Sequence, residues 1–194
     1  MQEKQVTIGK TTYPLPLPFF VMATQNPIES SGVYTLPEAQ TDRFLFKVFM
    51  KYPSAGDEKQ IMERNITLRK FEEFGLVPVI TPKEIMKMQE LVKSVYLDQR
   101  IKQYILDIVT KTRTKDFEHG EFIEWGCSPR ASISLFIAAK ARAFMEGRNF
   151  VVPTDVKNVA HEVLRHRIIL SYRARAEGLD SEKIIDEILE EEEL

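Results

Sequence analysis

Three polar side chains are candidates for chemistry because of the sequence around each of them. Asn26 follows the apolar run 19–23, so it is expected at the carboxyl end of a buried strand, where open α/β sheets bind ligands. Arg43 precedes a second apolar run, where a charged group needs a partner or a function. Arg130 falls in the first turn of a helix that begins at 128–129, where free N–H groups attract anions. Guanidinium groups suit phosphate, because their planar fork can bind two oxygens.

Each of these residues also has an ordinary structural explanation. Asn26 precedes a proline and is a common turn residue. Arg43 could form an ion pair with Asp42 or Glu38, and Arg130 could face solvent. The residue types alone leave both interpretations open.

Other catalytic and metal-binding patterns fail on spacing. Gly9-Lys10-Thr11 resembles the end of a phosphate-binding loop, but Lys4 stands where that loop needs a glycine. His161 and His166 are five residues apart and lie on different sides of a helix, and Cys127 is the only cysteine. We therefore expect no metal site built from protein side chains, no intrachain disulfide, and a buried thiol.

The elements that must position these residues change in type along the chain. Residues 5–13 predict a hairpin that turns at Gly9-Lys10, and the apolar runs 19–23 and 44–50 predict two buried strands of a parallel α/β layer. Two strands are too few for a stable sheet, so we expect the other strands in sequence before Met1. The predicted fold is an α/β fragment, residues 1–57, followed by an all-α bundle, residues 58–194.

Helix signals dominate the second half. Thr81-Pro82-Lys83-Glu84 forms a capping box, further helices are expected over about 99–112 and from Ser128-Pro129 to Gly147, and Thr154 is expected to cap another. The predicted buried stripe of the helix after Ser128 consists of Ile133, Ile137, Ala141, Phe144 and Met145. The glutamates at 190–193 are predicted to form a solvated tail.

The composition argues against several classes of partner. The 27 lysine and arginine residues are balanced by 29 aspartate and glutamate residues, which gives no sign of a nucleic-acid surface. No apolar run approaches the roughly 20 residues of a membrane-spanning helix, and residues 1–5 carry no signal-peptide core. We therefore expect a cytoplasmic protein that binds neither membranes nor nucleic acid.

Three ordered motifs resemble the MoxR family of AAA+ ATPases. They are Pro18-Phe19-Phe20-Val21-Met22-Ala23-Thr24-Gln25-Asn26-Pro27, Leu36-Pro37-Glu38-Ala39-Gln40-Thr41-Asp42-Arg43-Phe44 and Gly126-Cys127-Ser128-Pro129-Arg130-Ala131. The segments 151–156 and 163–168 also resemble the lid of that family. The resemblance implies the C-terminal strands of a P-loop core, with a hairpin before sensor 1, followed by a helical lid.

The resemblance also implies roles for the three candidates. Asn26 matches sensor 1, which helps to position the attacking water. Arg43 matches the arginine finger, which reaches the nucleotide of a neighbouring subunit, and Arg130 matches sensor 2. The implied parent is an ATPase that uses ATP and Mg²⁺, forms a homo-oligomeric, hexameric ring, and remodels or assembles clients such as von Willebrand-type proteins.

The sequence departs from that family in one respect: it contains neither a phosphate-binding loop nor an apolar run ending in Asp-Glu. Both motifs are expected before Met1. We therefore expect a C-terminal fragment whose first partner is its own N-terminal AAA+ core, and which alone neither binds nucleotide tightly nor hydrolyses ATP. Two alternatives remain. One is a non-catalytic interaction module, and the other is a DNA-contacting module of a hairpin-bearing helicase, with basic residues at 165–167 and 173.

Overall fold

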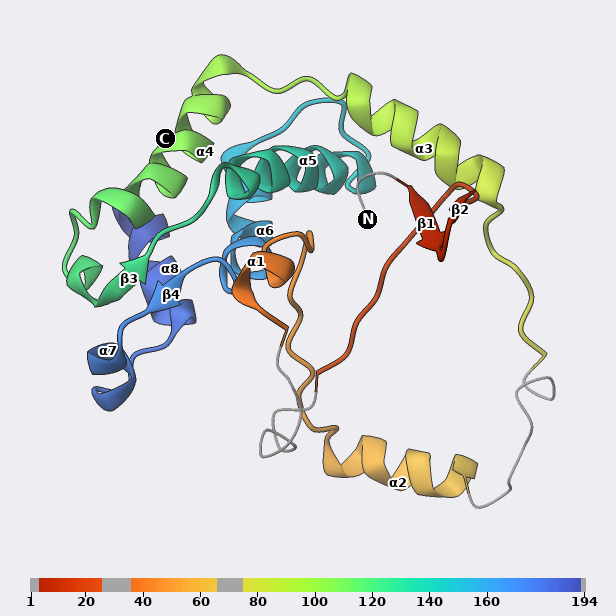
Figure 1. Cartoon of the computed structure of the whole chain (residues 1–194), viewed down its shortest axis with the longest axis horizontal. Helices are drawn as coiled ribbons and strands as arrows, with labels where there is room; N and C mark the ends of the chain where they lie inside the picture. Colours follow the sequence, from red (N-terminus) through yellow and green to blue (C-terminus); the bar gives the residue numbers. More distant parts are fainter. Residues whose placement is uncertain (1–3, 26–35, 66–74, 193–194) are drawn as a thin grey trace.

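The computed structural model describes residues 4–25, 36–65 and 75–192 (Figure 1). A helical bundle forms one end of the molecule; the segments 5–14 and 55–65 stand away from it, whereas residues 42–47 lie against it. This arrangement confirms the expected order of small strands first and helices after them.

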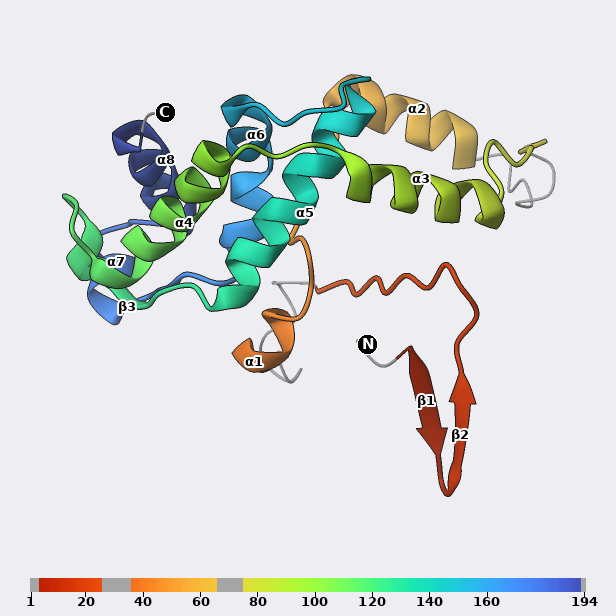
Figure 2. The same ribbon diagram turned by 90° about the horizontal axis from the view of Figure 1, so that it is seen from above.

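The predicted hairpin is present. Strand β1 (Gln5–Ile8) pairs antiparallel with β2 (Thr11–Pro14), and Gly9 has a φ of +63°, as the first central position of a type II′ turn requires. Every residue of the two strands is exposed, and the hairpin projects away from the helices (Figure 2). Gly9-Lys10 therefore forms a hairpin turn rather than a phosphate-binding loop.

The two buried strands predicted at 19–23 and 44–50 are wrong. Both segments lack strand pairing, and Phe20 and Met50 are 79% and 91% exposed. A strand needs a neighbour for its backbone hydrogen bonds, and no strand lies beside either segment in the described residues. The second segment instead follows the short helix α1 (Glu38–Thr41) to the helical bundle, where the Lys47 N–H donates to the Glu162 carbonyl at 2.8 Å.

The bundle contains the remaining elements apart from α2 (Ala55–Asn65), which stands away from it (Figure 1). They are α3 (Pro82–Ser94), α4 (Gln99–Thr114), a 3₁₀ turn (Gly120–Phe122), β3 (Ile123–Trp125), α5 (Pro129–Met145), α6 (Pro153–Leu164), β4 (Ile169–Leu170), α7 (Tyr172–Ala176) and α8 (Ser181–Glu191). The core lies between α4, α5, α6 and α8, and β3 pairs antiparallel with β4 beside it.

The predicted buried stripe of α5 is wrong for Ile133, Ile137 and Met145, which are 59%, 47% and 78% exposed, whereas Phe144 is partly buried against the core. The buried face is instead formed by small residues: Ala131, Ser134, Ala138, Ala139 and Ala143, with Leu135. This face packs against α6. Small side chains let two helix backbones approach each other closely, so the alanines, rather than the largest apolar residues, mark the contact.

Helix ends follow the predicted chemistry in two of three cases. Thr81 and Glu84 form the expected capping box, and Ser128 accepts the Arg130 N–H at the start of α5. The predicted cap at Thr154 is wrong, because α6 begins two residues earlier than that cap implies, with Val152 at the N-cap and Pro153 as the first helical residue. The Asp155 carboxylate accepts the Val152 N–H at 2.9 Å. Proline suits the first helical position, which explains why the helix begins at Pro153.

The acidic end of α8 is not simply a solvated tail. The Lys111 ammonium lies 2.6 Å from a carboxylate oxygen of Glu191 and 3.1 Å from one of Glu192. The prediction failed because it considered only the repulsion among the glutamates themselves. A cation on α4, distant in sequence, offsets that repulsion.

Candidate functional site

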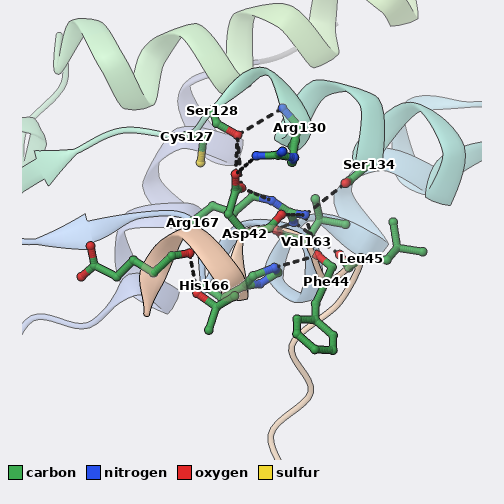
Figure 3. A network of polar contacts seen from close by, with 12 residues as sticks. Asp42, Phe44, Leu45, Cys127, Ser128, Arg130, Ser134, Val163, His166 and Arg167 are labelled. Atoms are coloured by element: carbon green, nitrogen blue, oxygen red, sulfur yellow. Dashed lines mark hydrogen bonds and ion pairs between the residues drawn. The ribbon is translucent and has the colours of Figure 1, made fainter. Parts of the chain in front are cut away.

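Asp42, which follows α1, contacts three side chains of the helical bundle (Figure 3). Its carboxylate accepts a hydrogen bond from Arg130 Nη1 at 3.0 Å, one from Arg167 Nε at 3.1 Å, and contacts from the Ser128 hydroxyl at 3.0 and 3.1 Å. These four residues are called the Asp42 cluster below. The cluster joins a residue of the first part of the chain to the start of α5 and the loop after α6.

The loop before α5 fixes the position of Arg130. Gly126 lies against the backbone of α4, where an added Cβ would come within 2.4 Å of the Thr112 carbonyl oxygen. The Thr112 hydroxyl accepts the Cys127 N–H at 3.0 Å, and Arg113 Nε donates to the Cys127 carbonyl at 2.8 Å. The glycine is therefore required for close approach, and this loop anchors the start of α5.

Cys127 is structural, as predicted. The side chain is buried, and burial raises the pKa of its thiol to about 12. A thiol with so high a pKa is a poor nucleophile at neutral pH.

Arg167 is the buried member of the Asp42 cluster, with a side chain only 1% exposed. Its guanidinium donates to backbone carbonyls on either side of Arg43: those of Asp42 at 3.2 Å, Phe44 at 2.6 Å and Leu45 at 3.3 Å. It also donates to the Ser134 hydroxyl at 3.2 Å and to the Val163 carbonyl. A buried guanidinium needs this many acceptors, and here most of them belong to the segment that carries Arg43.

Two neighbours of Arg167 extend the attachment along the same segment. Arg165 donates to the Lys47 carbonyl at 2.9 Å, lies 4.7 Å from the Phe49 ring centroid and forms two 2.9 Å bonds with Glu182 of α8. His166 Nε2 lies 3.1 Å from the Phe44 carbonyl. The chain from Asp42 to Phe49 is thus held by side chains from the loop after α6.

The Asp42 carboxylate is ionised. Partial burial alone would raise its pKa, but hydrogen bonds from Arg130 and Ser128 and the charge of Arg167 outweigh that effect and hold the pKa below its ordinary value. A carboxylate with two arginine partners is a local centre of negative charge. It can hold a guanidinium until a stronger anion replaces it.

His166 gives the attachment a dependence on pH. Burial, together with repulsion from Arg167 and Lys47, lowers the pKa of His166 to about 4, so the folded protein carries it neutral with Nε2–H donating to Phe44. The unfolded chain, in which a histidine titrates near 6.5, binds a proton first as the pH falls. The free energy of unfolding should therefore decrease between pH 7 and pH 5, and H166Q should flatten that decrease in urea titrations. Equal slopes for the two proteins would contradict this assignment.

The three candidates from the sequence have different outcomes. Asn26 lies outside the described residues. Arg130 is neither free nor fully solvent-facing, because it pairs with Asp42 while its side chain stays 42% exposed. Arg43 is exposed, and its guanidinium has no hydrogen-bond or ion-pair partner in the described parts of the chain. Its proposed pairing with Asp42 does not form, since that carboxylate binds Arg130 and Arg167.

Sequence reasoning missed Asp42 and Arg167 as members of the site. Both stand inside quoted motifs, but Arg167 was considered only as part of a basic helix and Asp42 only as a counter-ion of Arg43. The available signal in the sequence was the spacing of Arg167, which lies one turn beyond Val163 and Leu164 of the apolar stripe of α6. A charged residue there required a partner from elsewhere in the chain.

Two further properties bear on ligands. Within residues 4–25, 36–65 and 75–192, no three histidine, cysteine or acidic side chains converge in a way that could bind a metal ion. No helix in these ranges combines the length and the apolar character needed to cross a bilayer.

Comparison with known proteins places these features in a family. Residues 1–46 match the model of the ATPase family associated with various cellular activities (AAA), and residues 117–188 match the AAA lid domain. The Asp42 cluster draws one residue from the first match and three from the second.

Relatives match nearly the whole chain. The chaperone MoxR1 of Mycobacterium tuberculosis is 38% identical over 98% of this chain and 50% of its own length, and the uncharacterized protein YeaC of Bacillus subtilis is 43% identical over 97% and 57%. A crystal structure of a candidate ATPase from Cytophaga hutchinsonii superposes with a TM-score of 0.88 at 40% identity, over 97% of this chain and 58% of its own. The chain spans about half the length of these relatives. The matched models and relatives together show that the chain belongs to the MoxR family of AAA+ ATPases and carries the C-terminal part of that fold, with its lid.

Proposed function

We propose that this chain is the sensor and lid part of a ring-forming ATPase that hydrolyses ATP to ADP and phosphate and uses the energy to remodel or assemble other proteins. One observation carries the proposal: two arginines that could contact phosphate adjoin Asp42. Arg130 pairs with the Asp42 carboxylate and is half-exposed, and Arg43 is the exposed residue that follows Asp42 in the chain. Family membership gives this pair a ligand, the terminal phosphate of a nucleotide.

The roles follow from the chemistry of phosphoryl transfer, which depends on positioning and on neutralising charge. Bound ATP supplies the phosphoryl group. Arg130 would bind the terminal phosphate in its own subunit, and Arg43 would neutralise charge on that of a neighbour. Asn26 would orient the attacking water.

Exposed apolar side chains support the view that more protein covers this segment. Phe20, Met22, Val48, Met50 and Tyr52 are all largely exposed. Large apolar side chains exposed in this number are typical of a surface that another part of a protein covers. We propose that a nucleotide-binding core covers these side chains, with residues 1–57 completing that core and 58–194 forming the lid. We also propose that the full-length protein forms a hexameric ring, acts on von Willebrand-type or other client proteins, and is located in the cytoplasm.

The test is phosphate release with ATP and Mg²⁺. The 194-residue chain should release no phosphate above the rate of a boiled control, because it has no phosphate-binding loop, whereas a full-length protein containing it should turn over steadily. Sustained release by the short chain, or none by the full-length protein, would overturn the assignment.

The same exposed apolar side chains favour a second candidate, a non-catalytic interaction module. In that case the full-length protein would bind its partner with equal affinity in the presence and absence of ATP. A nucleotide-dependent affinity would exclude it.

A further inference from the structure

Two parts of Asp42 connect to the two proposed phosphate-binding arginines. Its carboxylate holds the guanidinium of Arg130 at 3.0 Å (Figure 3), and its backbone continues directly into Arg43. No other residue in the described parts of the chain contacts the side chain of one and adjoins the other. A change at the first arginine therefore has a short route to the second.

The Arg130 contact is suited to exchange. A single nitrogen of its guanidinium binds Asp42, and the side chain is partly open to water. A terminal phosphate carries more negative charge than a carboxylate and can accept a guanidinium through two oxygens. Bound ATP would therefore compete with Asp42 for Arg130, whereas ADP, which has no γ-phosphate, would leave the pair intact.

Asp42 would keep partners after such an exchange. Arg167 Nε and the Ser128 hydroxyl still donate to its carboxylate, and Arg167 is buried and cannot follow a ligand. Losing one of three donors leaves the carboxylate free to shift toward the other two. Arg167 also holds the carbonyls of Asp42 and Phe44, the residues on either side of Arg43, so a shift at Asp42 acts on the backbone of Arg43.

We propose that Asp42 is a positioning residue that couples the nucleotide of one subunit, sensed by Arg130, to the arginine that the same subunit presents to its neighbour. The inference rests on the proposed function. It assigns to the Asp42 cluster a role that neither arginine has alone: with ADP the pair Asp42–Arg130 is closed, and with ATP it is open and Arg43 changes position.

The test compares ATP and ADP binding to full-length protein with and without D42N. Asparagine keeps the size and an oxygen acceptor for Arg167 but removes the charge that competes for Arg130. We expect ATP to bind about three- to fivefold more tightly, as for an exposed ion pair, with ADP binding unchanged and turnover reduced at least tenfold. In an R130A background, D42N should no longer change the affinity for ATP.

Further variants separate this role from a purely structural one. D98N removes another helix-associated carboxylate of the lid, the N-cap of α4, and should leave the ratio of ATP to ADP affinity unchanged. D42E keeps the charge with a longer side chain, so the ratio should stay near that of the unchanged protein while turnover falls. If D42N does not fold, S128A, which loosens Asp42, should shift the ratio in the same direction.

The outcomes are distinct. Equal shifts in ATP and ADP affinity, no shift, or a shift that persists with R130A would overturn the coupling role of Asp42 while leaving an active ATPase. Absence of turnover in the unchanged full-length protein would instead overturn the proposed function.

Discussion

Replacing Arg43 with alanine in a full-length protein that contains this chain is expected to lower the proposed ATP turnover by about a thousandfold or more, the contribution of an arginine that neutralises charge during phosphoryl transfer. The Kd for ATP should change little, because Arg43 is proposed to act on the nucleotide of another subunit. The side chain is exposed and has no partner in the described residues, so its removal should not affect folding.

Two variants sharpen this experiment. R100A removes another exposed arginine, at the start of α4, and should leave turnover unchanged. R43K keeps the charge without the planar fork and should recover only a small part of the activity. Normal turnover of R43A in assembled rings would remove Arg43 from the reaction.

Replacing Arg167 with methionine is expected to cause the largest loss of stability. The variant leaves Asp42 short of one cationic partner and several carbonyls without a donor, and removing one side of a buried ion pair costs about 3 kcal/mol or more. Urea unfolding of the 194-residue chain would measure the loss as a lower midpoint with an unchanged slope.

The matched control is R175M, which replaces an exposed arginine of α7 and should change the free energy of unfolding by less than about 0.5 kcal/mol. In a double variant, D42N should reduce the cost of R167M, because the two side chains interact directly. A loss for R167M no larger than that for R175M would contradict the central position of Arg167.

The sequence predicts the helices well where local chemistry determines them. The capping box at Thr81 and the Ser128-Pro129 start need only neighbouring residues, so they follow from short patterns. The runs 19–23 and 44–50 look like strands for the same local reasons. Pairing with other strands decides that outcome, and the described residues contain no strand to pair with either run.

The candidate site shows the same division. The types of Arg43 and Arg130 suit phosphate binding, but the contacts that tie Arg130 and Arg167 to the residue before Arg43 span long stretches of sequence: Asp42 is 88 positions from Arg130 and 125 from Arg167. Spacing along one chain carries no information about such pairs. The alanine face of α5 was missed for a related reason, since the pattern ranks residues by size and packing against α6 selected the small ones.

The most direct test of the account mixes two inactive full-length proteins, R43A and R130A, in equal amounts and measures steady ATP turnover. If Arg130 acts on the nucleotide of its own subunit and Arg43 on that of its neighbour, one interface type in the mixed rings contains both arginines. Turnover should then recover to about a quarter of that of the unchanged protein. A mixture no more active than the average of the two variants would contradict the account.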